Sequence, residues 1–194
     1  MRDDLPDEVL MDQVAREDAA AFDALFVRHR RGVFHYTLRM VSEHALAEDL
    51  TQEAFLRVWR ARHSYRIGAS FRAWLFTIAR RVALDELRKR RLPTVRLSPD
   101  GDTDPRAACE PPADRSGADP VDAVVARELE RVIDVALDRL PEPLREVVIL
   151  RDAEGMSYEE MAQVVGCPLG TIKSRLSAAR ARLRDAAAAW LDIP

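Results

Sequence analysis

The side chains of this chain that could do chemistry together are basic and short polar residues, gathered in one segment near the C-terminus. Between Thr171 and Arg184 there are five basic residues and no acidic one, whereas the whole chain carries a formal net charge of −3. On an α-helix, short polar side chains near the start can reach base edges in the DNA major groove, and arginines further along can hold phosphates. The segment therefore predicts a DNA-binding surface.

A helix-turn-helix is predicted around this basic segment. Ser157 is a favourable N-cap, and Glu160 three residues later completes a capping box. Gly166 can adopt the left-handed angles that end a helix, and Pro168 suits the start of the next one. The second helix has one apolar stripe, formed by Ile172, Leu176, Ala179 and Leu183. Spacing alone also allows an ordinary helical hairpin with a solvated basic face, but the cap, the turn and the segregated charge favour DNA binding.

No catalytic or metal-binding pattern accompanies the motif. The sequence has no catalytic-triad order, no phosphate-binding glycine loop and no zinc-like spacing, so we expect a protein that is not an enzyme and uses no cofactor or metal. Cys109 and Cys167 are far apart and neither has a CxxC neighbour, which favours free thiols in a reducing cytoplasm. A signal-peptide pattern is not found, and no apolar run approaches the roughly 20 residues that span a bilayer.

The elements that must position these residues are expected to be helices. Hydrophobic residues make up 47% of the 194 positions, aromatic residues and glycine are few, and no alternating strand pattern is found. The composition changes abruptly in residues 93–122, which hold six of the eleven prolines, and residues 98–122 carry a net charge of −5. We therefore expect an all-α fold with two small helical domains, residues 1–92 and 123–194, joined by a flexible acidic linker over residues 93–122.

Periodicity predicts the helices of both domains. In the first domain they cover residues 6–16, 18–40, 44–61 and 71–91, with Ser42 as the cap of the third helix; in the second they cover 125–140 and 144–154, before the helix-turn-helix. The helix over 44–61 leaves one continuous ridge exposed, which consists of Asp49, Gln52, Glu53, Leu56 and Arg60. This ridge is either a solvated face, which periodicity alone favours, or a docking surface for a basic partner helix.

A polar loop, residues 63–70, separates two of these helices, and aromatic and basic residues surround it. Residues 80–96 carry a net charge of +5. Rings on which bases can stack, beside cations that follow a phosphate backbone, suit single-stranded nucleic acid. The alternative is that Tyr65, Phe71 and Trp74 belong to the core.

Four stretches occur in a specific order: AFDALFVRHRRGVF (residues 21–34), AEDLTQEAFLRVWRA (47–61), FRAWLFTIARRVALDELRKRR (71–91) and the segment 140–184 that ends in the helix-turn-helix. Together they resemble a bacterial RNA polymerase sigma factor of the extracytoplasmic-function (ECF) group of the sigma-70 family. The resemblance covers nearly the whole chain except the linker. It implies a subunit that binds core RNA polymerase and directs promoter-specific initiation.

The resemblance also implies roles for particular residues. The ridge would dock on a coiled coil of the polymerase β′ subunit through Asp49, Gln52, Glu53 and Leu56. The loop and the following helix would melt and read the minus-ten element of the promoter through Tyr65, Arg66, Ser70, Phe71, Trp74, Arg80, Arg81 and Arg88. The second helix of the helix-turn-helix would read the minus-thirty-five element through Thr171, Lys173, Ser174, Arg175, Ser177, Ala178 and Arg180.

Three positions depart from the pattern of relatives. Arg81 stands where many relatives have Asn, so a long cation replaces a neutral side chain that can read a base edge. Ser177 and Ala178 are smaller than the side chains that some relatives place there. Arg81 therefore predicts a different minus-ten preference. The smaller Ser177 and Ala178 predict fewer direct hydrogen bonds to bases, with room for a thymine methyl or for shape readout.

The expected partners follow from the resemblance: core RNA polymerase (the β′ coiled coil and the β subunit), promoter DNA, and a regulatory anti-sigma factor, with no small-molecule substrate and no membrane insertion. The acidic linker would thread the RNA exit channel. The free protein is expected to be a monomer. The competing hypotheses are a stand-alone dimeric repressor or activator, and an adapter that keeps the fold without reading promoters.

Overall fold

The computed structural model describes residues 4–66, 68–91 and 133–191. These ranges form helices and turns and contain no strand, in agreement with the expected all-α class. The predicted linker, its Cys109 and the predicted helix start at residue 125 lie outside the described residues.

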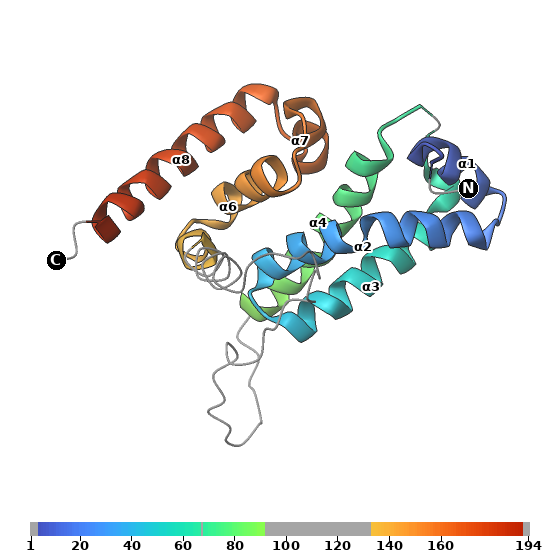
Figure 1. The fold of residues 1–194 in the computed structure, drawn as a ribbon, viewed down its shortest axis with the longest axis horizontal. Coiled ribbons are helices and arrows are strands. Elements are labelled where there is room, and N and C mark those ends of the chain that lie inside the picture. Colours follow the sequence, from blue (N-terminus) through green and yellow to red (C-terminus); the bar gives the residue numbers. More distant parts are fainter. Residues whose placement is uncertain (1–3, 67, 92–132, 192–194) are drawn as a thin grey trace, which may run out of the picture.

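The N-terminal half consists of four α-helices and one short 3₁₀ turn (Figure 1). They are α1 (Asp7–Ala15), α2 (Ala19–Val41), α3 (His44–Arg60), η1 (Arg62–Ser64) and α4 (Phe71–Arg91). Asp18 caps α2, because its carboxylate accepts hydrogen bonds from the backbone N–H groups of Ala20 at 3.0 Å and Ala21 at 3.1 Å. The four helices expected in this half from periodicity are all present, and none of their ends differs from expectation by more than one residue.

The expected cap of α3 is wrong. Ser42 instead ends α2 in the left-handed conformation, with φ 56°, and its backbone N–H bonds to Leu38. Glu43 occupies the N-cap of α3 and makes no side-chain cap bond. The Ser42 hydroxyl does not cap α3, because it donates a hydrogen bond to the Asp138 carboxylate at 2.7 Å.

The C-terminal half begins with a helical turn at residues 133–138 and continues with α6 (Glu142–Val148), η2 (Ile149–Ala153), α7 (Tyr158–Val165) and α8 (Leu169–Leu191). The single helix expected over 144–154 is therefore two segments. The second, η2, is a π-helical turn in which the Glu154 N–H bonds to Ile149 O five residues back, at 3.0 Å. This wider turn directs the chain into α7.

The helix-turn-helix has the expected local structure. Ser157 and Glu160 form a reciprocal capping box, with Glu160 N to Ser157 Oγ at 3.1 Å and Ser157 N to Glu160 Oε2 at 3.0 Å. Gly166 ends α7 in the left-handed conformation with φ 71°. The apolar stripe of α8 packs inward, where Ile172, Leu176 and Ala179 are buried. Beyond that stripe α8 runs away from the N-terminal helices (Figure 1).

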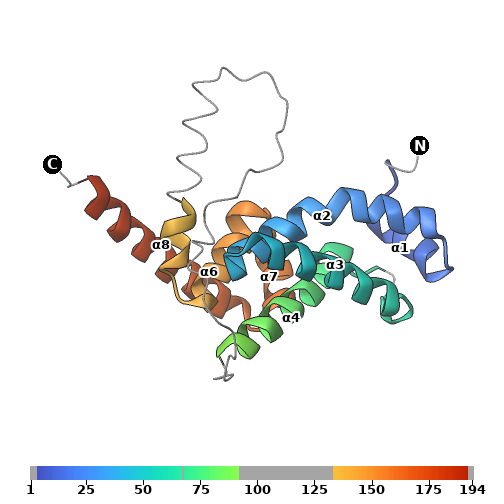
Figure 2. The ribbon, with the colours of Figure 1, turned by 90° about the horizontal axis from the view of Figure 1, so that it is seen from below.

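One hydrophobic core passes through both halves. It joins buried side chains of α1 to α4, such as Leu25 and Phe76, to those of η2, α7 and α8, such as Leu150, Met161 and Ile172. Helix α7 packs on α4, and α6 and η2 pack on α2; Figure 2 shows α6 and α7 beside the N-terminal helices. The two halves are therefore in close contact in this structure.

Two kinds of feature are absent from the residues that the structure describes. None of their helices has the length and apolar character needed to cross a membrane. The same residues hold no group of three or more His, Cys, Asp or Glu side chains arranged to bind a metal ion.

We predict that Ser157→Ala lowers the free energy of unfolding by about 1 kcal/mol, because it removes the oxygen that satisfies the Glu160 N–H at the start of α7. Urea denaturation followed by circular dichroism measures the loss. Ser177→Ala is the matched control, since Ser177 is exposed within α8 and alanine favours a helix there. Equal stability of the two variants would contradict the importance of the cap.

Candidate nucleic-acid and polymerase-binding surfaces

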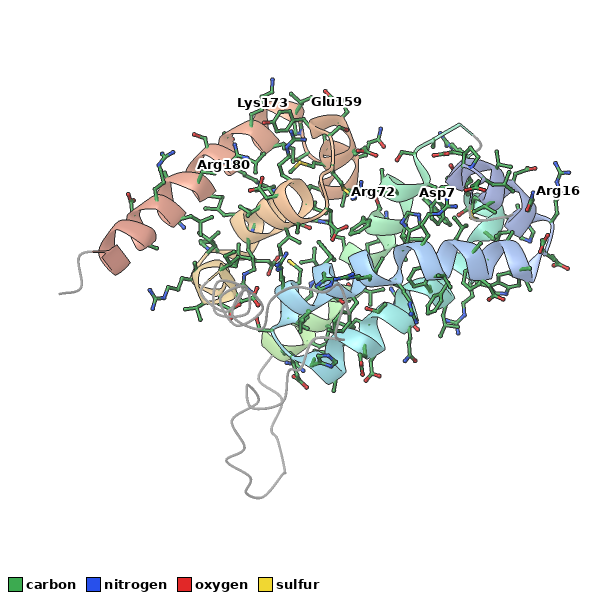
Figure 3. The ribbon with its side chains drawn as sticks, in the orientation of Figure 1. Asp7, Arg16, Arg72, Glu159, Lys173 and Arg180 are labelled. Carbon is green, nitrogen blue, oxygen red and sulfur yellow. The ribbon has the colours of Figure 1, made fainter. Side chains whose placement is uncertain are left out.

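The first candidate surface is the exposed side of α8. Lys173, Ser174, Ser177, Ala178 and Arg180 are all exposed. Lys173 and Arg180 project from this helix in Figure 3. The side chains expected to read and hold the minus-thirty-five element therefore all lie on α8. All of them are exposed except Thr171 and Arg175, which are partly buried.

Contacts within the C-terminal half position two of these cations. The Lys173 ammonium lies 5.8 Å from the centroid of the Tyr158 ring, and Tyr158 also stacks against the Arg151 guanidinium, 5.0 Å away. Arg180 pairs with Asp152 at 3.1 Å, with both side chains about half exposed. An exposed pair of this kind contributes little to stability, so Arg180 can exchange Asp152 for a phosphate at small cost.

The second candidate surface is the exposed ridge of α3 without its last member, Arg60, which lines the cavity described below. The remaining residues, here called the α3 ridge, are Asp49, Gln52, Glu53 and Leu56. Asp49 and Gln52 are exposed, and Leu56 is 50% exposed, which is unusual for a leucine among the described residues. Glu53 differs, because it accepts a hydrogen bond from Arg57 Nε at 2.7 Å one helical turn later. This bond lowers the pKa of Glu53, so the Glu53 carboxylate stays ionised to a lower pH than an unpaired glutamate would. The i, i+4 spacing of Glu53 and Arg57 could have revealed this pair in the sequence.

The third candidate surface, the loop between η1 and α4, differs from expectation. Phe71 is fully buried between His29, Tyr65 and Trp74, so its ring is a core element and cannot stack on a base in this structure. Tyr65 is 9% exposed, and its hydroxyl donates to the Ala69 carbonyl oxygen. These rings therefore hold the loop in shape. Arg66 is exposed and Trp74 is partly exposed, so both remain available at the surface.

Two further minus-ten candidates are bonded to the C-terminal half. Arg80 Nε donates to Glu146 Oε1 at 2.6 Å, and Ser70 Oγ donates to Glu160 Oε1 at 2.9 Å. Glu146 is 2% exposed and also accepts a bond from the Tyr36 hydroxyl at 3.1 Å. Burial and the nearby Glu146 carboxylate raise the pKa of Tyr36 well above its ordinary value, so Tyr36 remains a neutral donor. Sequence reasoning missed both hydrogen bonds to Glu146, because Arg80 and Tyr36 are 66 and 110 residues away from it in the sequence.

Another arginine of α4, two helical turns before Arg80, makes a similar contact. Arg72 reaches from α4 toward the C-terminal helices in Figure 3, where it donates to the Glu154 backbone oxygen and lies 3.5 Å from Glu154 Oε2. Burial raises the pKa of Glu154 in spite of this cation.

The remaining minus-ten cations are exposed. Arg88 pairs with Asp85 at 3.3 Å, whereas Arg81 has no ion pair among the described residues. Arg81 lines an open cavity of about 360 Å³ together with Arg57, Arg60, Ala61 and Ile78. Arg57 and Arg60 were not expected at the DNA surface from the sequence, although their three-residue spacing on α3 places both on one side.

Two Sigma-70 family regions match the segments of the chain that carry these surfaces. Residues 25–92 match Sigma-70 region 2, and residues 130–183 match Sigma-70 region 4. The chain is 34% identical over 177 residues to the RNA polymerase sigma-H factor of Pseudomonas aeruginosa, covering 90% of each chain. It is also 34% identical over 186 residues to the ECF RNA polymerase sigma-E factor of Escherichia coli K12, covering 93% of each chain.

Solved structures agree with these matches. CnrH, determined in complex with the cytosolic domain of CnrY, superposes with a TM-score of 0.71 at 26% identity, covering 94% of this chain and 97% of that one. The sigma factor RpoE of Bartonella quintana, determined with the anti-sigma factor NepR, superposes with a TM-score of 0.63 at 31% identity, covering 84% and 94%. The chain belongs to the sigma-70 family of RNA polymerase sigma factors, in the extracytoplasmic-function group.

Proposed function

We propose that this protein binds core RNA polymerase through the α3 ridge and directs the enzyme to promoters that α8 and the α4 region recognise. The observation that carries the proposal is the position of two accessible surfaces. The ridge lies in the segment that matches Sigma-70 region 2, and the basic side of α8 lies in the segment that matches region 4. The protein acts as an initiation factor, while the polymerase performs the chemistry.

The ridge is suited to a basic partner helix. Asp49 and Glu53 can accept charge-assisted hydrogen bonds, and the exposed Leu56 supplies an apolar anchor between them and the end of α3. The hydrogen bond from Arg57 already restrains the Glu53 side chain, which reduces the entropy lost when a partner binds. The partner that fits is a helical segment rich in arginine, such as the β′ coiled coil.

At the minus-ten element, the buried rings have a supporting role. Phe71 and Tyr65 hold the loop, while the exposed Arg66 and the partly exposed Trp74 are placed to meet an unstacked base. Arg81 and Arg88 hold backbone phosphates, and Arg57 and Arg60 extend this cationic surface. The domain boundaries that we propose are residues 1–92 and 123–194.

An anti-sigma factor regulates this protein in the proposed function. In support, the neighbour RpoE was determined with the anti-sigma factor NepR, and the neighbour CnrH was determined with the cytosolic domain of CnrY. The ridge and the α4 surface are the faces that an inhibitor would cover. The proposed site of action is the cytoplasm, where the polymerase is found.

We predict that the triple variant Asp49→Ala, Gln52→Ala, Glu53→Ala binds core polymerase at least about tenfold more weakly, a loss of about 1.4 kcal/mol, and fails to initiate at its promoter. The measurements are native gel shift with core enzyme and transcription from the promoter upstream of this protein's own gene. Asp23→Ala is the control, because Asp23 is an exposed acid on α2, away from the ridge. Undiminished binding of core would refute the assignment of the ridge.

The same experiment separates the competing hypothesis. A stand-alone repressor would form no complex with core enzyme and would bind a specific duplex tightly by itself. A sigma factor would be monomeric in native mass spectrometry and would recognise the promoter only within the holoenzyme.

A second prediction distinguishes base reading from phosphate binding on α8. Lys173→Ala should reduce discrimination between the preferred and a substituted minus-thirty-five element by about 1–3 kcal/mol, because Lys173 is placed to donate to a guanine edge. Arg182→Ala should weaken both elements alike and lower the salt dependence of binding by about one charge. Holoenzyme competition assays at two salt concentrations measure both effects. A uniform loss with Lys173→Ala would assign that residue to the phosphate backbone instead.

A further inference from the structure

Three segments of the C-terminal half meet at the ring of Tyr158, the first residue of α7. The Arg151 guanidinium of η2 lies 5.0 Å from the ring centroid, and the Lys173 ammonium of α8 lies 5.8 Å from it. Both distances are within the range in which a cation is attracted to an aromatic face. The ring therefore connects the π-helical turn to the helix that is proposed to read the minus-thirty-five element.

The backbone around Tyr158 is fixed by hydrogen bonds on both sides. The reciprocal bonds between Ser157 and Glu160 cap the first turn of α7. Arg151 Nη1 donates to the Met156 carbonyl oxygen at 2.6 Å, which closes the connection between η2 and α7. The Tyr158 side chain is partly buried and packs against the hydrophobic core. Its ring therefore has a defined position before any partner binds.

The two cations at this ring have no acidic partner. Neither Arg151 nor Lys173 forms an ion pair within the part of the chain that the structure describes, whereas Arg180 on the same helix pairs with Asp152. Two nearby cations repel each other, and the electron-rich face of the ring offsets part of that repulsion. The ring therefore supplies the attraction that holds the Lys173 ammonium beside α7.

A restraint of this kind matters for a lysine. Its ammonium is a compact charge at the end of a flexible four-carbon chain, and a free chain loses rotamer entropy when it binds a partner. Only two of the 30 basic residues of the protein are lysines, Lys89 and Lys173. Because the ring already restrains Lys173, this side chain loses less entropy when it donates to a base.

The place of Lys173 on α8 agrees with such a role. The residue lies in the second turn of the helix, and residues near the start of a recognition helix are the ones that contact base edges. Its side chain is exposed and projects from α8 in Figure 3. The ring thus restrains the ammonium while leaving it accessible to DNA.

We propose that Tyr158 is a positioning residue for promoter specificity: its ring, supported by Arg151, holds the Lys173 ammonium in the orientation in which it donates to a base of the minus-thirty-five element. Tyr158 acts on base recognition through Lys173. The inference rests on the proposed function, because it takes Lys173 as a base-reading residue. It adds a residue of the first helix of the helix-turn-helix to the determinants of specificity.

Two substitutions separate this role from simple packing. Tyr158→Leu keeps an apolar side chain against the core but removes the aromatic face. Tyr158→Phe keeps that face and removes only the hydroxyl group, so it should behave like the unchanged protein. A packing role alone would make both substitutions nearly neutral for the Lys173 side chain.

The first experiment observes Lys173 in the free full-length protein by nuclear magnetic resonance. Protein labelled with carbon-13 lysine gives one set of side-chain signals for each of the two lysines, and Lys89→Arg assigns them. The ring current of Tyr158 should shift the Lys173 Hε signal upfield of the Lys89 signal, because Lys89 pairs with Glu86 instead. Tyr158→Leu should remove this shift, and Tyr158→Phe should retain it.

Glu159→Gln is the matched control, since Glu159 is the exposed neighbour of Tyr158 on α7, and its loss should leave the Lys173 signal in place. Coincident signals of the two lysines in the unchanged protein would overturn the inference, and this result is available even if Tyr158→Leu does not fold. A Lys173 signal that Tyr158→Leu leaves unshifted would overturn it as well.

The second experiment measures specificity in the holoenzyme, as the ratio of affinities for the preferred and a substituted minus-thirty-five element. Tyr158→Leu should lower this ratio at least fivefold, whereas Tyr158→Phe should stay within twofold of the unchanged protein. The double variant Tyr158→Leu, Lys173→Ala should lose no more than Lys173→Ala alone, because one residue acts through the other. Additive losses, or a higher ratio in Tyr158→Leu, would overturn the inference.

Failure of the proposed function gives a different pattern. An unchanged ratio in Lys173→Ala, together with a ring-shifted Lys173 signal, would refute base reading by Lys173 and with it the effect of the ring on specificity. A reduced ratio in Lys173→Ala that Tyr158→Leu does not reproduce would refute the positioning role alone and leave the proposed function standing.

Discussion

A buried carboxylate joins the two halves of this protein across their shared hydrophobic core. Glu146 accepts bonds from Arg80 and Tyr36, which come from two different N-terminal helices, and almost none of it meets solvent. The energetics of such a group are asymmetric. With both partners present its net contribution to stability is small, because desolvation opposes the Coulombic attraction, but removal of one partner leaves a charge stranded in a low-dielectric environment. The Glu146 contact therefore favours one geometry of the interface while it adds little to the stability of that interface.

Local features of the fold were predictable from the sequence because their causes are local. The capping box at Ser157 and Glu160 and the left-handed turn at Gly166 involve residues within four positions of one another. The apolar stripe of α8 follows from helical periodicity alone. The predicted cap of α3 was wrong, because Ser42 has two other roles. It ends α2 in the left-handed conformation, and its hydroxyl donates a hydrogen bond to Asp138, 96 residues away.

The candidate site was less predictable, because burial depends on tertiary packing. Phe71 and Tyr65 have aromatic rings of the kind on which bases stack, yet Phe71 packs against His29 and Trp74 and lies in the core. The helix predicted over 144–154 contains a π-helical turn that no periodicity marks. Exposed positions on regular helices, such as Lys173 on α8 and Leu56 on α3, were predictable because the opposite stripe defines the buried face. The pairing of Arg80 with Glu146 could be found only from the three-dimensional structure, because the two residues are 66 positions apart in the sequence.

Charge distribution connects these observations. A chain with net charge −3 that carries a basic recognition helix has internal carboxylates within reach of its own cations, and the structure shows them in contact at Arg80, Arg72 and Arg180. The exposed pair at Arg180 is easily displaced by a phosphate, whereas the buried pair at Arg80 is released only when α6 leaves α4. The Arg80 side chain is therefore far less accessible to a polyanion than the Arg180 side chain on α8.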